Sequence, residues 1–228
     1  MILTLIEKEH LLDNVWAFRF EPSEPLEWMA GQYVSVELPH KDPDGEGTRR
    51  WFTISSAPYE KILQITTRVT QSTFKQALSQ LNVGDTALQL LDKPHGDFVW
   101  EDSDKPLVFV AGGIGITPFH SMLKQRAHEN LPLHVTLIYA SRTPEVPFKD
   151  ELQAWIEKDP QFKVQYVVGE PLTAARLMAL VPTLNQSLVY LTGPQPLVVP
   201  LADDLEAQGL PEAQLKQDFF PAYTKHNY

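Results

Sequence analysis

The chain has 228 residues, of which 43% are hydrophobic and 21% charged, and its formal net charge is −10. This balance is typical of a globular protein with enough apolar material for one large domain or two smaller ones. The acidic total, with no Lys/Arg cluster beyond Arg49–Arg50, argues against nucleic-acid binding, and the absence of cysteine excludes disulfides and cysteine-ligated iron–sulfur clusters within this chain.

No segment approaches the ~20 consecutive apolar residues of a membrane helix. The N-terminal sequence MILTLIEKEHLLDN lacks the pattern of a secretory signal. We therefore expect no membrane span and a cytoplasmic location. Seven histidines are present, but none stands in a metal-ligand spacing such as H-E-x-x-H, so no metal site is expected.

The first hundred residues are predicted to be mostly β-structure. GQYVSVELP (31–39) and ILQITTRV (62–69) alternate with the period of two that marks half-buried strands, and turn-rich segments separate such stretches. One helix is predicted after Ser72, a candidate N-cap, because Phe74, Leu78 and Leu81 share one face. Many short strands with a single helix are typical of a small closed barrel.

The pattern changes after the polar segment 101–106. LVFVAGG (107–113) is a continuous apolar run, as expected of a strand buried on both faces. Helical and strand-like segments then alternate to the C-terminus, which predicts a mostly parallel, doubly wound sheet. We expect an antiparallel β-barrel domain over 1–102 and a nucleotide-binding α/β domain over 103–228.

A glycine-rich turn, AGGIGITPFHSML (111–123), follows the first strand of the α/β half. Gly112, Gly113 and Gly115 allow a ligand to approach the backbone, and Thr117 is the predicted N-cap of a helix that begins at Pro118. A helix N-terminus offers N–H groups to an anion such as a pyrophosphate. The spacing is not G-x-G-x-x-G, and a turn that serves packing alone is the alternative.

The segment RRWFTISSAP (49–58) combines cations, aromatic rings and hydroxyls. Alternation places Arg50 and Phe52 on one side of a strand and Trp51 and Thr53 on the other. This mixture suits a planar cofactor that carries phosphate, and an exposed surface strand is the alternative.

A third segment, LTGPQPL (191–197), ends another buried strand. With Gly113 and Tyr139–Arg142 it is expected at the carboxyl edge of the parallel sheet, where ligands bind in such folds.

These segments resemble, in order, the motifs of the ferredoxin–NADP reductase family. RRWFTISS is similar to its R-x-[YF]-[ST] flavin motif, and AGGIGITPFHSML to its G-G-x-G-x-[TS]-P nucleotide motif. YASRTPEVPFKDEL and LTGPQPL resemble its next two nucleotide-side motifs, while GQYV and PHGDF stand where the family has equivalents. The resemblance spans nearly the whole chain. It implies a flavoprotein oxidoreductase that takes hydride from NADPH or NADH onto FAD and passes electrons to a separate acceptor.

On the flavin side, the resemblance implies that Arg50 holds a flavin phosphate, Phe52 lies against the isoalloxazine ring and Thr53 hydrogen-bonds near N5. The usual tyrosine of this motif is Phe52 here, so a phenol hydroxyl is missing. Ser72 can serve as a plain helix cap as well as a phosphate ligand. The other predicted flavin contacts are Trp51, Thr67, Val69, Ser72 and Thr73.

On the nucleotide side, the resemblance implies that Gly112, Gly113, Gly115 and Thr117 surround the dinucleotide pyrophosphate, with Gly193 and Pro194 as further contacts. Ser141 and Arg142 are expected near the adenosine ribose. Arg142 favours NADPH, and a surface ion pair is its alternative role.

The predicted catalytic residues are Thr53, Thr192 and Tyr223. Thr192 stands where the family often has a cysteine close to the hydride-transfer site. Tyr223 is the first candidate, and Tyr228 the second, for the C-terminal aromatic that covers the flavin and contributes to its site in many members. Either tyrosine could instead belong to an exposed tail.

The electron acceptor stays open among ferredoxin, flavodoxin, an oxygenase component, and a small molecule such as a quinone or free flavin. Ferredoxin and flavodoxin are typically acidic, so a net charge of −10 opposes their approach unless a local basic patch forms. The rival hypothesis is a non-catalytic flavin- or nucleotide-binding subunit with a regulatory or electron-transfer role. The absence of cysteine argues against the known iron–sulfur version of such a subunit.

Overall fold

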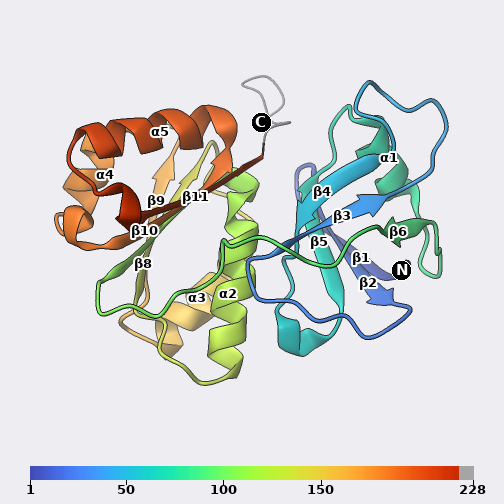
Figure 1. Ribbon diagram of the computed structural model, residues 1–228, viewed down its shortest axis with the longest axis horizontal. Helices are drawn as coiled ribbons and strands as arrows, with labels where there is room; N and C mark the ends of the chain where they lie inside the picture. Colours follow the sequence, from blue (N-terminus) through green and yellow to red (C-terminus); the bar gives the residue numbers. More distant parts are fainter. Residues whose placement is uncertain (221–228) are drawn as a thin grey trace. The chain divides into compact units, whose positions relative to one another are not determined.

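The computed structural model describes residues 1–220, and the chain divides into two compact units (Figure 1). The first unit comprises Met1–Trp100 together with His120–His128. The second comprises Glu101–Phe119 and the chain from Glu129 onward. The flavin and nucleotide roles of the two predicted domains stay predictions, and Tyr223 and Tyr228 lie outside the described residues.

The first unit contains a six-stranded sheet in the order β4-β3-β6-β1-β2-β5, with every pairing between neighbouring strands antiparallel. An antiparallel bridge between Ile54 and Ile65 joins the two ends of the sheet, so the predicted antiparallel barrel is confirmed. The strands are β1 (Ile2–Leu12), β2 (Val15–Pro22), β3 (Tyr33–Glu37), β4 (Arg49–Thr53), β5 (Leu63–Arg68) and β6 (Leu88–Leu90).

The barrel encloses the core of the first unit. Val34 and Val36 of β3 are completely buried, as the alternation of that segment predicts. Helix α1 (Thr73–Gln80) adds Phe74 and Leu78 to the same core, and both side chains are fully buried. The apolar face of α1 therefore fixes the position of its N-terminus, where Ser72 and Thr73 lie.

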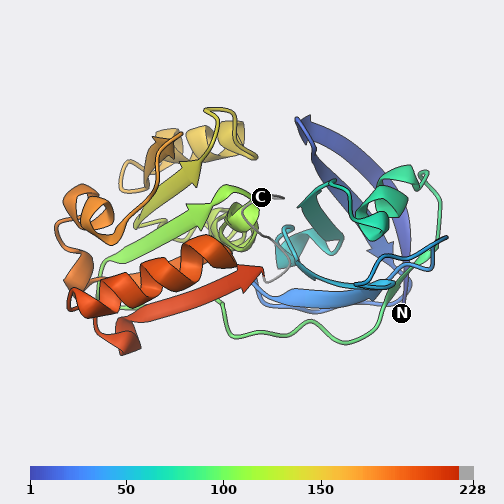
Figure 2. The ribbon, with the colours of Figure 1, turned by 90° about the horizontal axis from the view of Figure 1, so that it is seen from above.

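The second unit contains a five-stranded parallel sheet in the order β11-β10-β7-β8-β9. Figure 2 shows its strands running in the same direction. The predicted parallel α/β fold is confirmed. Its strands are β7 (Leu107–Gly112), β8 (Val135–Ser141), β9 (Lys163–Val168), β10 (Leu188–Pro194) and β11 (Leu215–Phe220).

Helices cover both faces of this sheet (Figure 1). Phe109 of β7 stacks on Phe119 of α2 at a centroid distance of 4.3 Å, whereas its neighbour Val108 packs in a cluster with Leu177 of α4 and Leu201 of α5. β7 is therefore buried on both sides, as its continuous apolar run predicts. The helices are α2 (Ile116–His128), α3 (Lys149–Lys158), α4 (Ala174–Leu180) and α5 (Gln195–Ala207).

The predicted start of α2 at Pro118, with Thr117 as N-cap, is wrong because the helix begins at Ile116. The 3₁₀ turn η2 (Gly113–Gly115) runs directly into it, and the Ile116 N–H is donated to carbonyls of that turn. Thr117 lies inside the first helical turn, where its hydroxyl donates to the carbonyl of Ile114 at 3.1 Å.

Within residues 1–220, no helix combines the length and apolarity that crossing a bilayer requires. The same residues contain no group of three or more histidine, aspartate or glutamate side chains arranged to hold a metal ion.

Candidate functional site

In the second unit, the glycine turn after β7 packs against the end of β10. Gly113 has a φ of 53°, in the left-handed region that favours glycine. A Cβ atom on Gly115 would lie 2.6 Å from the backbone oxygen of Thr192, and one on Gly193 would lie 3.1 Å from Cα of Gly112. Close packing of two strand ends therefore accounts for Gly115 and Gly193, while backbone conformation accounts for Gly113.

These two strand ends meet at the point where the strand order reverses. From β7 the chain proceeds to β8 and β9 on one side, and β10 and β11 lie on the other. Open parallel sheets bind ligands in the crevice at the carboxyl ends of such strands. Gly113, Thr192 and Gly193 lie at this edge of the sheet, as the sequence predicted, and Thr117 lies in the first turn of the helix that follows the glycine turn.

At this edge, the hydroxyl of Thr192 is a buried polar group that lacks a hydrogen-bond partner in the structure. The Thr192 side chain as a whole is completely buried. A buried polar group without a partner costs about 1–3 kcal/mol. The hydroxyl is therefore available to a ligand group that could satisfy it.

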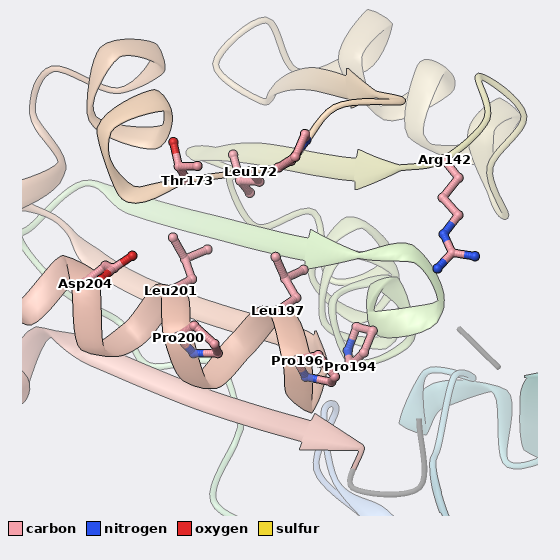
Figure 3. A pocket seen from close by; sticks show the side chains of 10 residues that line it. Arg142, Leu172, Thr173, Pro194, Pro196, Leu197, Pro200, Leu201 and Asp204 are labelled. Atoms are coloured by element: carbon pink, nitrogen blue, oxygen red, sulfur yellow. The ribbon is translucent and has the colours of Figure 1, made fainter. Parts of the chain in front are cut away.

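A pocket of about 490 Å³ lies beside this edge, in the size range of small-molecule sites (Figure 3). Its walls are mostly apolar side chains from α5 and from the segment before α4. Arg142, at the end of β8, and Asp204, on α5, lie at opposite sides of it in Figure 3. The lining residues are Arg142, Pro171, Leu172, Thr173, Pro194, Pro196, Leu197, Pro200, Leu201 and Asp204.

The pocket includes two residues that the sequence analysis predicted, Arg142 and Pro194. Ser141 is not among its lining residues, and its hydroxyl donates to the backbone carbonyl of Thr143. Sequence analysis missed the apolar walls and Asp204. Pro200 was the available signal, since a proline in the interior of a predicted helix is unusual.

In the first unit, Arg50 lies between the loop 41–48 and the N-terminus of α1. It is 8% exposed, and its Nη2 donates to Asp44 at 2.9 Å and to the hydroxyl of Ser72 at 3.3 Å. The other oxygen of the Asp44 carboxylate accepts the backbone N–H of Thr73 at 2.9 Å. The structure thus brings together three predicted phosphate ligands, Arg50, Ser72 and Thr73, around an anion supplied by the chain.

The ionisation of Asp44 reflects these contacts. Burial raises the pKa of its carboxyl, but hydrogen bonds from the backbone of Thr73 and Glu46, the hydroxyl of Thr73 and Arg50 outweigh this effect. The pKa is lowered from 3.8 to about 2. Because these donors stabilise a carboxylate, their chemistry fits the phosphate of a flavin nucleotide.

The predicted aromatic contacts are separated by the strand. Phe52 is 8% exposed and packs in the barrel core, tilted against Phe74 at a centroid distance of 5.8 Å. Trp51 is 58% exposed and meets Tyr33 and His95 edge-on. Thr53 and Thr67 are buried, at 6% and 2% exposed. The flavin-ring roles of these side chains stay predictions.

The hydroxyls that follow Thr53 have structural partners. Ser55 hydrogen-bonds to the Gln64 carbonyl and the Thr66 hydroxyl, and Ser56 donates to the carbonyl of Ile62. Val69 donates its backbone N–H to Asn14 at 2.7 Å. Ser72 stands at the N-cap position of α1 without a capping hydrogen bond from its side chain, so its hydroxyl is used toward Arg50.

Residues 109–199 match the family model described as an oxidoreductase NAD-binding domain. This segment contains the glycine turn, Arg142 and the end of β10, which are the elements that form the candidate nucleotide site. The nucleotide-binding assignment of this part of the chain therefore has support besides its geometry.

Known relatives extend the match to nearly the whole chain. A flavohemoprotein of Burkholderia sp. (strain TH2) is 30% identical over 91% of this chain and 56% of its own length. The toluate 1,2-dioxygenase electron transfer component of Pseudomonas putida is 29% identical over 86% of this chain and 60% of its own. The chain thus spans little more than half the length of the curated relatives it matches first.

Solved structures share the fold. A ferredoxin–NADP⁺ reductase from Neisseria gonorrhoeae, with bound FAD and NADP, has a TM-score of 0.80 at 20% identity, covering 96% of this chain and 98% of that one. Together, the barrel, the parallel sheet, the nucleotide-domain match and these relatives confirm the predicted resemblance to the ferredoxin–NADP reductase-like family of oxidoreductases.

Proposed function

We propose that the chain is an NAD(P)H-dependent flavin oxidoreductase that takes hydride from a nicotinamide dinucleotide onto FAD and delivers electrons to a separate acceptor. The observation that carries this proposal is the close packing of the glycine turn after β7 against the end of β10 at the switch point of the parallel sheet, where the buried hydroxyl of Thr192 has no partner. The barrel's cluster of Arg50, Ser72 and Thr73 supports the flavin part of the proposal, because Arg50 and Thr73 of this cluster donate hydrogen bonds to an anion, the carboxylate of Asp44.

The residues of the chain would act by binding and orientation. Arg50, Ser72 and Thr73 would hold a flavin phosphate, and the first turn of α2 would hold the nucleotide pyrophosphate. Thr192 would offer its hydroxyl to the nicotinamide half. FAD, when bound, supplies the hydride acceptor and can release electrons singly. The protein therefore needs no side-chain acid or base for hydride transfer, and its contribution is position and electrostatics.

The pocket beside Arg142 is our proposed site for the adenosine half of the nucleotide. Its apolar walls suit a purine ring, and Arg142 lies where its guanidinium could pair with a 2′-phosphate. This arrangement favours NADPH over NADH.

For the acceptor we propose a redox protein, of which an oxygenase component is supported by two relatives. One is the toluate dioxygenase electron transfer component, and the other is a glycine betaine monooxygenase reductase subunit from Chromohalobacter salexigens, 27% identical over 92% of this chain and 61% of its own length. A cytoplasmic location stays a prediction from the sequence.

Anaerobic reduction tests the central proposal. Purified protein, as isolated or after addition of FAD, should show the yellow absorbance of bound flavin, and NADPH or NADH should bleach it. Protein that cannot be loaded with FAD would contradict a flavoenzyme. Yellow protein that neither nucleotide reduces would favour the non-catalytic binding role instead.

A further inference from the structure

The loop 41–48 and the residues beside it contact all three nitrogens of the Arg50 guanidinium. Its Nη1 donates to the backbone carbonyls of Glu46, Gly47 and Arg49 at 2.7–3.0 Å, and its Nη2 donates to Asp44 and Ser72. The carboxylate of Glu46 lies 3.1 Å from Nε, in ion-pair contact but outside hydrogen-bond geometry. While the loop stays in place, Nη1 and Nη2 are both engaged, and only the Nε–H of this guanidinium is without a hydrogen-bond acceptor.

The same loop is tied to the N-terminus of α1. Asp44 accepts the backbone N–H of Thr73 at 2.9 Å, and the hydroxyl of Thr73 accepts the backbone N–H of Asp44 at 3.0 Å. His40 lies 3.0 Å from that hydroxyl through Nε2. Asp44 thus joins the guanidinium and the helix N-terminus, as a bound phosphate would.

We propose that Asp44 is an internal competitor for the flavin phosphate, and that flavin binds by displacing its carboxylate from Arg50 and Thr73. This inference rests on the proposed flavin-binding function. Asp44 would lower the affinity for flavin because its carboxylate occupies the donors that the flavin phosphate needs. A carboxylate and a phosphate cannot use the same donors together, so the free energy of the Asp44 contacts is subtracted from that of flavin binding.

The remainder of the loop makes few packing contacts with the rest of the first unit. The side chains of Lys41 and Asp42 are 93% and 86% exposed, and a Cβ atom on Gly45 or Gly47 would meet no atom within 4 Å. Few packing contacts would be lost if the segment moved away from α1. Displacement can therefore remain local and leave the barrel core intact.

The test measures FAD affinity by quenching of flavin fluorescence during titration with flavin-free protein. Asp44→Asn keeps an oxygen for the Thr73 N–H but removes the charge that pairs with Arg50, so it should bind FAD about tenfold more tightly than wild type. Asp42→Asn is the matched control. It removes the same charge from an exposed position in the same loop and should keep the wild-type affinity.

Hydrogen exchange of the wild-type protein gives a second measurement that depends on no variant. On FAD addition, the backbone amide of Asp44 should lose the protection given by the Thr73 hydroxyl, while the amide of Thr73 should stay protected by the phosphate. An Asp44 amide that stays equally protected with FAD bound would overturn the inference.

The outcomes separate the two proposals. Equal or weaker FAD binding by Asp44→Asn, with wild type binding FAD, overturns the competitor inference and leaves the flavin-binding function standing. Failure of wild type and both variants to bind FAD overturns the proposed function, and the inference with it. Tighter FAD binding by Asp44→Asn, with Asp42→Asn at the wild-type affinity, supports both the competitor inference and the flavin-binding function.

Discussion

The backbone oxygen of Thr192 lies 2.6 Å from the point where a Cβ atom of residue 115 would be. Real Cβ atoms do not approach a backbone oxygen so closely, so the turn after β7 can touch the end of β10 only with glycine at that position. The carboxyl edge of the sheet is therefore organised by a contact between two backbones. A side chain there would move both strand ends that form the candidate nucleotide site.

Gly115→Ala should lower the free energy of unfolding by about 1–3 kcal/mol, because the added methyl group overpacks a rigid contact. Urea denaturation measures the change. Gly45→Ala is the control, since nothing lies within 4 Å of its Cβ position, and it should change stability by less than about 0.5 kcal/mol. Identical unfolding midpoints for Gly115→Ala and wild type would show that the strand ends can separate without cost.

Arg142→Ala should raise the KM for NADPH about tenfold more than the KM for NADH, because a guanidinium–phosphate pair is lost only with NADPH. Steady-state flavin reduction with both nucleotides measures this ratio. Arg176→Ala is the control, since Arg176 pairs with Glu170 and does not line the pocket. An equal effect of Arg142→Ala on both nucleotides would remove Arg142 from the 2′-phosphate role.

Both sheets were predictable from the sequence because the burial of a strand determines the pattern of apolar residues along it. All six residues of β7 are buried, as the run LVFVAG requires. The start of α2 was mispredicted because cap preferences favour Thr117, whereas the 3₁₀ turn of Gly113–Gly115 brings helical geometry forward to Ile116. A tertiary contact with β10, absent from local propensity, holds that turn in place.

The candidate sites were predictable only in part, for a related reason. Motif spacing identified Arg50 and Thr73, but the pairing of Arg50 with Asp44 depends on how the loop folds back onto α1. Likewise, Leu172 and Leu201 line one pocket although 29 positions separate them along the chain, and hydrophobicity alone does not distinguish pocket walls from core.

Thr192→Val should raise the free energy of unfolding by about 1 kcal/mol, because it replaces a buried hydroxyl without a partner by a methyl group of similar size. The same change should slow flavin reduction if the hydroxyl contacts the nicotinamide. Urea denaturation and stopped-flow reduction measure the two effects. Thr117→Val is the control with the opposite sign for stability, since its hydroxyl donates to Ile114. A Thr192→Val protein less stable than wild type would indicate that the hydroxyl already has a partner.

Asp44→Asn should make stability less dependent on pH in acid. The folded-state pKa of Asp44 is about 2 and its ordinary value is 3.8, so the ionised carboxylate stabilises the fold above pH 3.8, and this contribution is lost as pH falls through about 2. Unfolding free energies measured by urea between these two pH values should therefore fall more steeply for wild type than for Asp44→Asn. Asp42→Asn, which changes an exposed carboxyl of the same loop, should retain the wild-type slope. Parallel slopes for wild type and Asp44→Asn would mean that the contacts of Asp44 with Arg50 and Thr73 do not stabilise the folded protein.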